Sequence, residues 1–157
     1  MNLNMVIIYS LGVWNLAITL LCYLILRRKK TLFEDRFATT ITKTATSITS
    51  LLFGLHFSLI ISAELSTLFM CTTIFGILIG ALFGSLVKYH SLLVGMYHGI
   101  IGSSMGLMIG EVLKNPQLCS IPIASQQQLL MNMYQICGFA TLLLTFVISL
   151  VLYSLRV

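Results

Sequence analysis

One histidine and two methionines in a single apolar run are the first residues that could do chemistry. His98 and Met105 are seven residues apart, so a helix would place them at nearly the same angle around its axis, with Met108 somewhat further round. Imidazole nitrogen and thioether sulfur suit Cu(I) in a dry environment, and His56 could add a nitrogen from an earlier run. The alternative is that the methionines only fill apolar gaps. The candidate cofactor is copper or another transition metal.

Two acidic residues define a second candidate ion site. Glu64 and Glu111 fall at the ends of apolar runs that are predicted to reach the same side of a membrane. A proton or another cation could enter between them and pass to His56 and His98, which lie deeper. The alternative is that both carboxylates only reach interfacial water, with Lys114 as a local partner three residues after Glu111.

The other polar residues of the apolar runs do not assemble into catalytic machinery. The sequence contains no HExxH or P-loop pattern and no paired intramembrane aspartates, and Ser103 and Ser104 have no aspartate partner. We therefore expect a protein that is not an enzyme. Asn15, Asn132 and Gln135 are expected to form hydrogen bonds between helices.

Glycines are concentrated in two apolar runs between residues 76 and 110. Those of the second run follow steps of four, three, four and four, so they share one helix face. Those of the first run are four residues apart and form a second such face. Glycine permits close backbone approach, which matters in lipid because the hydrophobic effect hardly drives helices together there. The predicted helix-packing residues are Gly76, Gly80, Gly84, Gly95, Gly99, Gly102, Gly106 and Gly110.

The short connection between these two runs indicates how the glycine faces meet. Only Lys88, Tyr89 and His90 separate the runs, so the two helices must be antiparallel neighbours. The simplest arrangement is a hairpin in which one glycine face presses on the other. The alternative is that the longer stripe meets the same helix of a second copy or a partner protein.

The composition of the chain places it in a membrane. Of its 157 residues, 58% are hydrophobic and 8% are charged, whereas a soluble domain of this size needs more polar surface. The charges fall in short breaks between apolar runs of about membrane-spanning length, roughly 20 residues. This pattern is typical of an all-α, polytopic integral membrane protein. Its surroundings are the lipid bilayer, and we expect no nucleic-acid partner.

We expect a helical bundle of about five transmembrane helices that form a single transmembrane domain, 1–157. The predicted spans are 5–26, 47–63, 66–87, 91–113 and 129–155. The second span is the weakest, because a segment rich in threonine and serine precedes it. Either that segment is an interfacial amphipathic helix that runs into the span, or one long tilted helix starts near Glu34.

Basic residues predict the orientation of the chain, because lysine and arginine favour the cytoplasmic ends of spans. With the N-terminus outside and the C-terminus in the cytoplasm, Lys114 is the one basic residue that falls outside. The cytoplasmic set is Arg27, Arg28, Lys29, Lys30, Arg36, Lys43, Lys88 and Arg156. The expected location is the cell (plasma) membrane.

Two functions follow from these features. The first is a non-enzymatic accessory or assembly subunit that packs through its glycine-rich helices with itself, as a homo-oligomer, or with a larger membrane complex. The second is a small membrane transporter or binding protein for a copper-like transition metal or another cation. Stoichiometric copper that is lost on replacing His98 and Met105 would favour the second function, and a defined partner without metal would favour the first.

Overall fold

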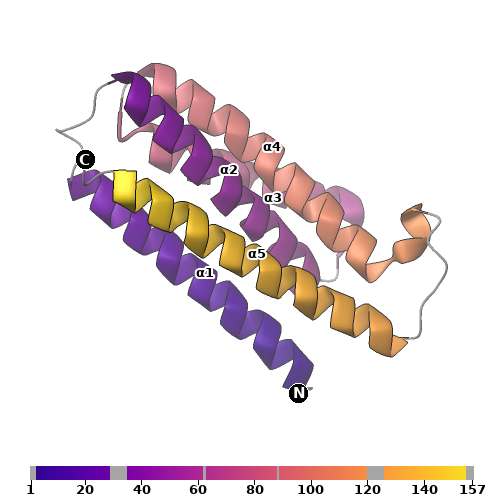
Figure 1. Cartoon of the computed structure of the whole chain (residues 1–157). Coiled ribbons are helices and arrows are strands. Elements are labelled where there is room, and N and C mark those ends of the chain that lie inside the picture. Colours follow the sequence, from indigo (N-terminus) through magenta and orange to yellow (C-terminus); the bar gives the residue numbers. More distant parts are fainter. Residues whose placement is uncertain (1–2, 29–34, 62, 88, 120–125, 155–157) are drawn as a thin grey trace.

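The computed structural model of the chain describes residues 3–28, 35–61, 63–87, 89–119 and 126–154. The described residues form helices and no strand, so the predicted all-α bundle is confirmed (Figure 1). The elements are α1 (Leu3–Arg28), α2 (Asp35–Ile60), α3 (Leu65–Gly84), α4 (Tyr89–Lys114), the short 3₁₀ helix η2 (Pro116–Cys119) and α5 (Gln126–Ser154).

Among the described helices, α1, α3, α4 and α5 are long and apolar enough to cross a membrane. These four helices indicate a membrane-embedded protein. The second predicted span is the exception, because α2 carries Asp35, Arg36 and Lys43 together with many threonines and serines in its first half. Lipid is a poor solvent for such a helix, so α2 needs cover from its neighbours.

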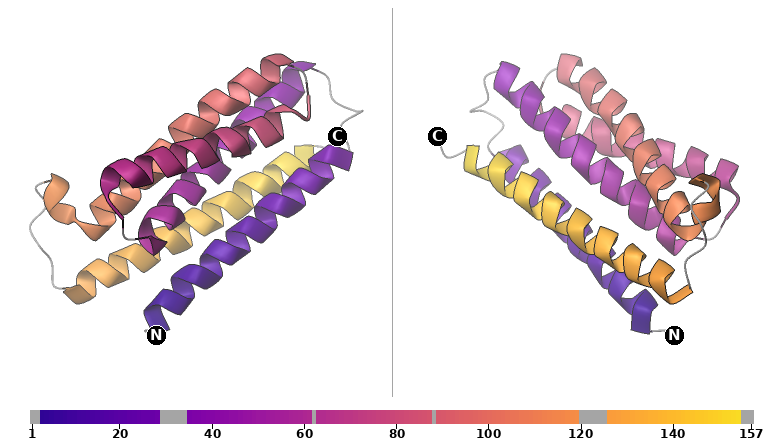
Figure 2. Two further views of the ribbon diagram at one scale, coloured as in Figure 1. Left: turned by 180° about the vertical axis from the view of Figure 1, so that it is seen from behind. Right: turned by 45° about the vertical axis from the view of Figure 1, so that its right-hand side comes forward.

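The polar helix α2 has that cover because it contacts all four other long helices (Figure 2). It is one continuous helix, which confirms the alternative of a long helix that starts near Glu34. Thr46 and Ser50 have no exposed surface. Several hydroxyl groups of α2 donate to its own backbone: Thr49 Oγ1 to the Ala45 carbonyl at 2.7 Å and Ser50 Oγ to the Thr46 carbonyl at 2.8 Å, whereas the buried Thr46 Oγ1 has no partner among the described residues. Internal hydrogen bonds of this kind let a polar helix lie in apolar surroundings.

The five long helices form two groups. Helices α2, α3 and α4 pack closely, whereas α1 and α5 lie side by side and contact the first group mainly through α2 (Figures 1 and 2). Successive helices alternate in direction, so α1 and α5 run parallel and end at the same end of the bundle (Figure 1). Of the four helices suited to crossing a membrane, α1 is the least buried. The boundary between the groups holds much of the buried apolar core, in which Cys22, Ala45 and Leu144 have no exposed surface.

The outer faces of α1 and α5 carry large apolar side chains. Val13, Trp14, Leu142 and Phe146 are each more than half exposed. Such faces would be a liability in water, but in a bilayer lipid tails cover them at no cost. The surface pattern therefore agrees with the membrane setting that the composition predicts.

Candidate functional site

The predicted packing glycines of α3 meet the first two glycines of α4. A methyl group added at Gly80 would lie 2.6 Å from the carbonyl carbon of Gly95, and one added at Gly99 would lie 2.9 Å from the carbonyl carbon of Gly76. Gly84 also faces the α4 backbone. The atoms in the way belong to the main chain, which cannot rotate aside as a side chain can. The two helices therefore touch backbone to backbone over this stretch.

The other three predicted packing glycines of α4 contact α2. A methyl group at Gly106 would lie 2.9 Å from Leu55 N, one at Gly110 would lie 2.7 Å from Ser58 Oγ, and Gly102 faces α2 in the same way. We expected the whole α4 stripe to meet either the α3 glycines or another chain. Instead it is divided between two neighbours within this chain, because α2 presents small residues of its own to α4.

The small face of α2 includes a glycine that the sequence analysis missed. A methyl group at Gly54 would lie 3.1 Å from Leu107 N of α4. A signal for it was present, because small residues of α2 follow steps of three, four and four, as do residues 99, 102, 106 and 110 of α4. Serines at most of these positions make the pattern less visible than a run of glycines. The α2 residues are Ser47, Ser50, Gly54 and Ser58.

The predicted ion-site residue Glu111 lies in a polar junction between the ends of α2 and α4. Ser58 Oγ donates to Glu111 Oε1 at 2.7 Å, and Lys114 Nζ lies 3.0 Å from the same oxygen. Lys114 Nζ also donates to the Ile61 carbonyl at 3.1 Å, just after the last turn of α2. The local partner expected for Glu111 is thus confirmed. The junction ties two helix ends together and satisfies a carbonyl that the helix itself leaves open.

The other predicted ion-site residues of α3 and α4 have separate surroundings. Glu64 is exposed just before α3, and Met105 and Met108 are both more than half exposed on α4. The His98 ring lies with its centroid 5.5 Å from that of the neighbouring Tyr97. Among the described residues, no group of three histidine, cysteine, aspartate or glutamate side chains could hold a metal ion.

Residues 102–106 of α4 read Gly-Ser-Ser-Met-Gly, which matches the GxSxG pattern of serine hydrolases in its letters. In those enzymes the central serine sits on a sharp turn between a strand and a helix. Here the stretch lies inside the continuous helix α4, and both of its glycines face α2. The matching residues therefore lie in a packed helix and not on the sharp turn that presents a nucleophilic serine.

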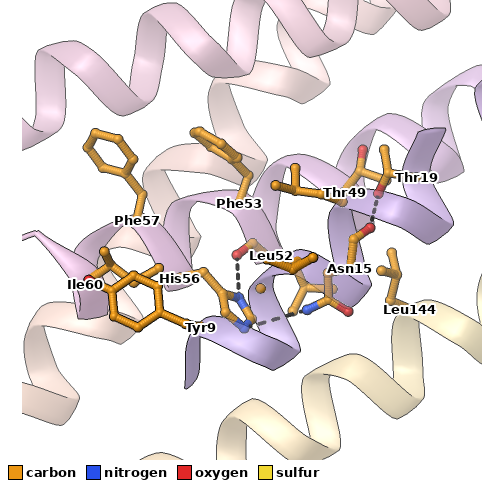
Figure 3. Close-up of a pocket in the computed structure, with 13 residues that line it drawn as sticks. Tyr9, Asn15, Thr19, Thr49, Leu52, Phe53, His56, Phe57, Ile60 and Leu144 are labelled. Atoms are coloured by element: carbon orange, nitrogen blue, oxygen red, sulfur yellow. Dashed lines mark hydrogen bonds between the residues drawn. The ribbon is translucent and has the colours of Figure 1, made fainter. Parts of the chain in front are cut away.

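The remaining predicted ion-site residue, His56, lines a cavity between α1 and α2 (Figure 3). The cavity has a volume of about 240 Å³, and Leu144 of α5 borders it. An apolar cavity of about 150 Å³ is already large enough to bind benzene. Most of the wall is apolar, with Leu52, Phe53 and Phe57 from α2. The space lies between the two helix groups.

A buried pair of polar side chains, Asn15 of α1 and His56 of α2, lies at this cavity (Figure 3). His56 Nδ1 is 2.9 Å from the Leu52 carbonyl oxygen, which can only accept, so Nδ1 carries the proton and Nε2 of the neutral ring is an acceptor. Asn15 Nδ2 lies 3.5 Å from that Nε2, at the long limit of a hydrogen bond. The expected contact of Asn15 between helices is confirmed, whereas Asn132 and Gln135 are exposed on α5.

The Asn15 side chain is only partly satisfied. Its residue is 7% exposed, and its Oδ1 is buried without a hydrogen-bond partner among the described residues. A buried acceptor that loses water without gaining a partner costs about 1–3 kcal/mol. With less than 1 Å² of accessible surface, this oxygen lies behind its neighbours and not on the open wall of the cavity.

No family model, no curated protein and no solved structure matches this chain. The evidence for a function therefore comes from the site itself. The cavity between α1 and α2 is the candidate site, because it joins a ligand-sized space to buried polar groups, as small-molecule sites generally do.

Proposed function

We propose that this chain is a non-enzymatic integral membrane protein that binds a small, largely apolar molecule in the cavity between α1 and α2. The observation that carries this proposal is the cavity itself, whose volume of about 240 Å³ is bounded by apolar walls and by the buried Asn15 and His56. Apolar walls with few polar groups are typical of small-molecule sites. Binding of this kind requires no chemical step.

The position of the cavity favours entry of the ligand from the lipid. Val13 and Leu16 line the cavity and are 66% and 59% exposed, on the face of α1 that a bilayer would cover. Tyr9, one turn earlier, also lines it and is half exposed. A molecule dissolved among lipid tails could therefore reach the site sideways between α1 and α2, with no need for a water-filled path.

The location and orientation of the chain form part of the proposal. We infer that it lies in the plasma membrane, with the start of α1 outside and the end of α5 in the cytoplasm, because basic residues favour cytoplasmic ends. Helix α1 then begins at the outer side, and the Glu111–Lys114 junction lies at the same side, since α4 runs from the cytoplasm outward. The cavity lies between Tyr9 and Thr19 along α1, which puts it in the outer and middle part of the bilayer.

The accessory-subunit function that the glycines suggested depends on a free small-residue face. All eight predicted glycines are in contact with α2, α3 or α4 of this chain, so those faces are not open to a partner. That function stays a prediction, and it would require a surface other than these glycine faces to bind the partner. The copper and cation functions likewise stay predictions; among the described residues no three histidine, cysteine, aspartate or glutamate side chains could hold a metal ion.

A Gly12→Leu variant tests the proposed function. Gly12 lines the cavity, and a methyl group there would meet only the His56 side chain, at an ordinary 3.5 Å from Cδ2, so we expect a leucine to fill part of the cavity. We expect native mass spectrometry of gently extracted wild-type protein to show a bound apolar molecule, and the variant to lose at least about nine-tenths of it.

Gly138→Leu is the matched control for this experiment. Gly138 lies on α5, and a methyl group there would meet nothing within 4 Å. This variant should keep the bound molecule and the helical circular dichroism of the wild type. A wild type that carries no bound molecule, or a Gly12→Leu variant as fully loaded as the control, would show that the cavity is not a binding site.

A further inference from the structure

We propose that the cavity between α1 and α2 holds one unbranched acyl chain of a membrane lipid, which lies along the two helices with its headgroup at the end of the bundle where α2 ends. This inference rests on the proposed binding function and names the ligand. It follows from the shape of the cavity, from its depth in the bundle and from its opening toward lipid.

The cavity is long and narrow. Its lining residues run from Tyr9 to Thr19 on α1 and from residue 49 to residue 60 on α2, which is about 15 Å along each helix axis. Tyr9 lies beside Ile60 at one end of the row, and Thr19 lies beside Thr49 at the other (Figure 3). A compact cavity of about 150 Å³ holds one benzene ring. Here about 240 Å³ extends over about three helical turns, which suits a single hydrocarbon chain better than a ring system.

The cavity has the depth of one lipid leaflet. The hydrocarbon core of a bilayer is about 30 Å thick, so the tails of one leaflet span about 15 Å, a length similar to that of the cavity. The cavity also begins near one end of the bundle, because Ile60 is the last residue of α2 and Tyr9 lies within the first two turns of α1. A lipid whose headgroup lies at that surface therefore has its chain at the level of the cavity.

The wall of the cavity suits a chain that has no polar group. Apolar atoms form nearly all of its surface, with Leu52, Phe53 and Phe57 among the lining residues. The described lining residues include no lysine, arginine, aspartate or glutamate, so a charged group inside would lack a counter-charge. Methylene groups lose nothing there, because they make dispersion contacts and need no hydrogen bond.

The lining hydroxyl groups do not change this preference. Thr19 Oγ1 donates to the Asn15 carbonyl at 2.8 Å, and Thr49 Oγ1 donates to the Ala45 carbonyl at 2.7 Å. Both protons are therefore used within their own helices. A polar ligand would find no free donor in either hydroxyl, whereas a hydrocarbon chain requires none.

The cavity is continuous with the lipid-facing surface of α1. Val13 and Leu16 line it and are each more than half exposed, so a chain can enter sideways from the neighbouring lipid tails. Tyr9 is half exposed at the end where the headgroup would lie. Tyrosine is enriched at the membrane–water interface, so its place there agrees with a headgroup that stays outside the cavity.

Photolabelling by a phospholipid tests this proposal. The probe is a phosphatidylcholine with a diazirine in the middle of one acyl chain, added as a minor component to phosphatidylcholine vesicles that contain the full-length protein. Peptide mass spectrometry compares the label in residues 49–60 of α2 with that in residues 65–74 of α3, which include exposed side chains that bulk lipid contacts. Residues 49–60 are all buried or half-buried, so bulk lipid alone would label them weakly. We expect them to be labelled at least as strongly as residues 65–74.

The matrix lipid tests whether the chain must be unbranched. Straight-chain phosphatidylcholine competes with the probe for the cavity. Diphytanoyl phosphatidylcholine, whose chains carry methyl branches, should compete poorly because the branches overpack a narrow space. In the branched matrix, the label in residues 49–60 relative to residues 65–74 should therefore rise about 5-fold or more, the lower end of the usual effect of overpacking.

The variant Gly12→Leu tests whether the label reports the cavity. Its leucine should fill part of the space, so residues 49–60 should lose most of their label while residues 65–74 keep theirs. Gly138→Leu, at a position on α5 where a methyl group meets nothing within 4 Å, should label as the wild type does.

The outcomes separate this inference from the proposed function. Weak labelling of residues 49–60, or labelling that Gly12→Leu leaves unchanged, overturns the lipid chain. If the wild type still carries a different apolar molecule that Gly12→Leu loses, the binding function stands. Equal relative labelling in the two matrices overturns the selection of an unbranched chain, and this comparison holds even where Gly12→Leu fails to fold. Absence of both the label and any bound molecule overturns both proposals.

Discussion

Asn15 and His56 illustrate how the surroundings of a residue decide its chemistry. Asn15 suggested a hydrogen bond between helices, and His56 suggested a ligand for a metal. In the structure they contact each other, with a long distance of 3.5 Å between Asn15 Nδ2 and His56 Nε2, and both border the same cavity. Neither residue type nor spacing indicates this pairing, because the two residues are 41 positions apart in the sequence and lie on different helices.

At the scale of one residue, substitutions of Glu111 test whether its contacts stabilise the fold. Glu111→Gln keeps an acceptor for the buried Ser58 hydroxyl and loses only the partly exposed ion pair with Lys114, so the free energy of unfolding should fall by at most about 1 kcal/mol. Glu111→Leu removes both contacts and should cost about 1–3 kcal/mol. Unfolding by sodium dodecyl sulfate in mixed micelles, followed by circular dichroism, measures both.

The informative result is which of these two variants loses more free energy of unfolding. If Glu111→Leu is as stable as the wild type, the Ser58–Glu111–Lys114 junction does not hold the ends of α2 and α4 together. A Lys114→Met variant serves as the comparison, because it removes the ion pair and the hydrogen bond to the Ile61 carbonyl while leaving Ser58 bonded to Glu111.

At the scale of elements, α2 and α4 fit because each carries small residues on the face that meets the other. Residues 47, 50, 54 and 58 of α2 follow steps of three, four and four, and the α4 glycines that face them, at 102, 106 and 110, are four residues apart. Between matched small faces the backbones approach closely, which supplies the dispersion and Cα–H···O contacts that hold helices together in lipid. The same contact keeps the polar hydroxyls of α2 away from the lipid.

Gly80→Ala tests the backbone contact between α3 and α4. The added methyl would lie 2.6 Å from the Gly95 carbonyl carbon and 2.8 Å from Met96 Cα, so the helices must move apart. We expect the free energy of unfolding in mixed micelles to fall by about 1–3 kcal/mol, as for overpacking in a core. Gly138→Ala, which meets nothing within 4 Å, should be neutral or slightly stabilising. Equal stability of the two variants would argue against close α3–α4 packing.

Gly106→Ala makes the corresponding test for α2 and α4. Its methyl would lie 2.9 Å from Leu55 N, again a backbone atom. A loss of stability of about 1–3 kcal/mol with no change of oligomeric state in detergent is expected, because the partner of Gly106 is α2 of the same chain. A variant of unchanged stability that alters the oligomeric state would instead place this glycine between copies.

At the scale of the whole molecule, the backbones of α2 to α4 approach closely, whereas α1 and α5 pack on α2 through larger apolar side chains (Figure 2). The cavity lies where the two groups meet. Val13 and Leu16 of its wall are exposed, so the cavity opens toward the lipid-facing side of α1. This is the arrangement that a ligand arriving from the bilayer requires.

Labelling of introduced cysteines tests the orientation of the molecule. Asn115 and Ser85 are exposed, just after α4 and α3 respectively, and the alternation of helices puts them at opposite ends of the bundle. In a background without native cysteines, a membrane-impermeant maleimide added to intact cells should label Asn115→Cys at once. It should label Ser85→Cys only after permeabilisation. The reverse pattern would invert the proposed topology.

Some of this protein follows from the sequence by itself. Composition and the length of the apolar runs predict a helical membrane bundle, and the three-residue connection at residues 88–90 predicts that α3 and α4 are neighbours. These are local properties, because run length, helical period and a short loop act within one or two elements. The contacts of the glycines at positions 76 to 99 are also predictable from the sequence, since a hairpin leaves these glycines few other partners.

Tertiary structure decided the rest. It divided the α4 stripe between α3 and α2, enclosed a helix too polar to face lipid, and brought Asn15 to His56 at a cavity. The physical reason is that both the lipid-facing and the buried side of a membrane helix are apolar, so hydropathy alone does not distinguish them. Which neighbour a face meets depends on the packing of all five helices at once. No single segment carries that information.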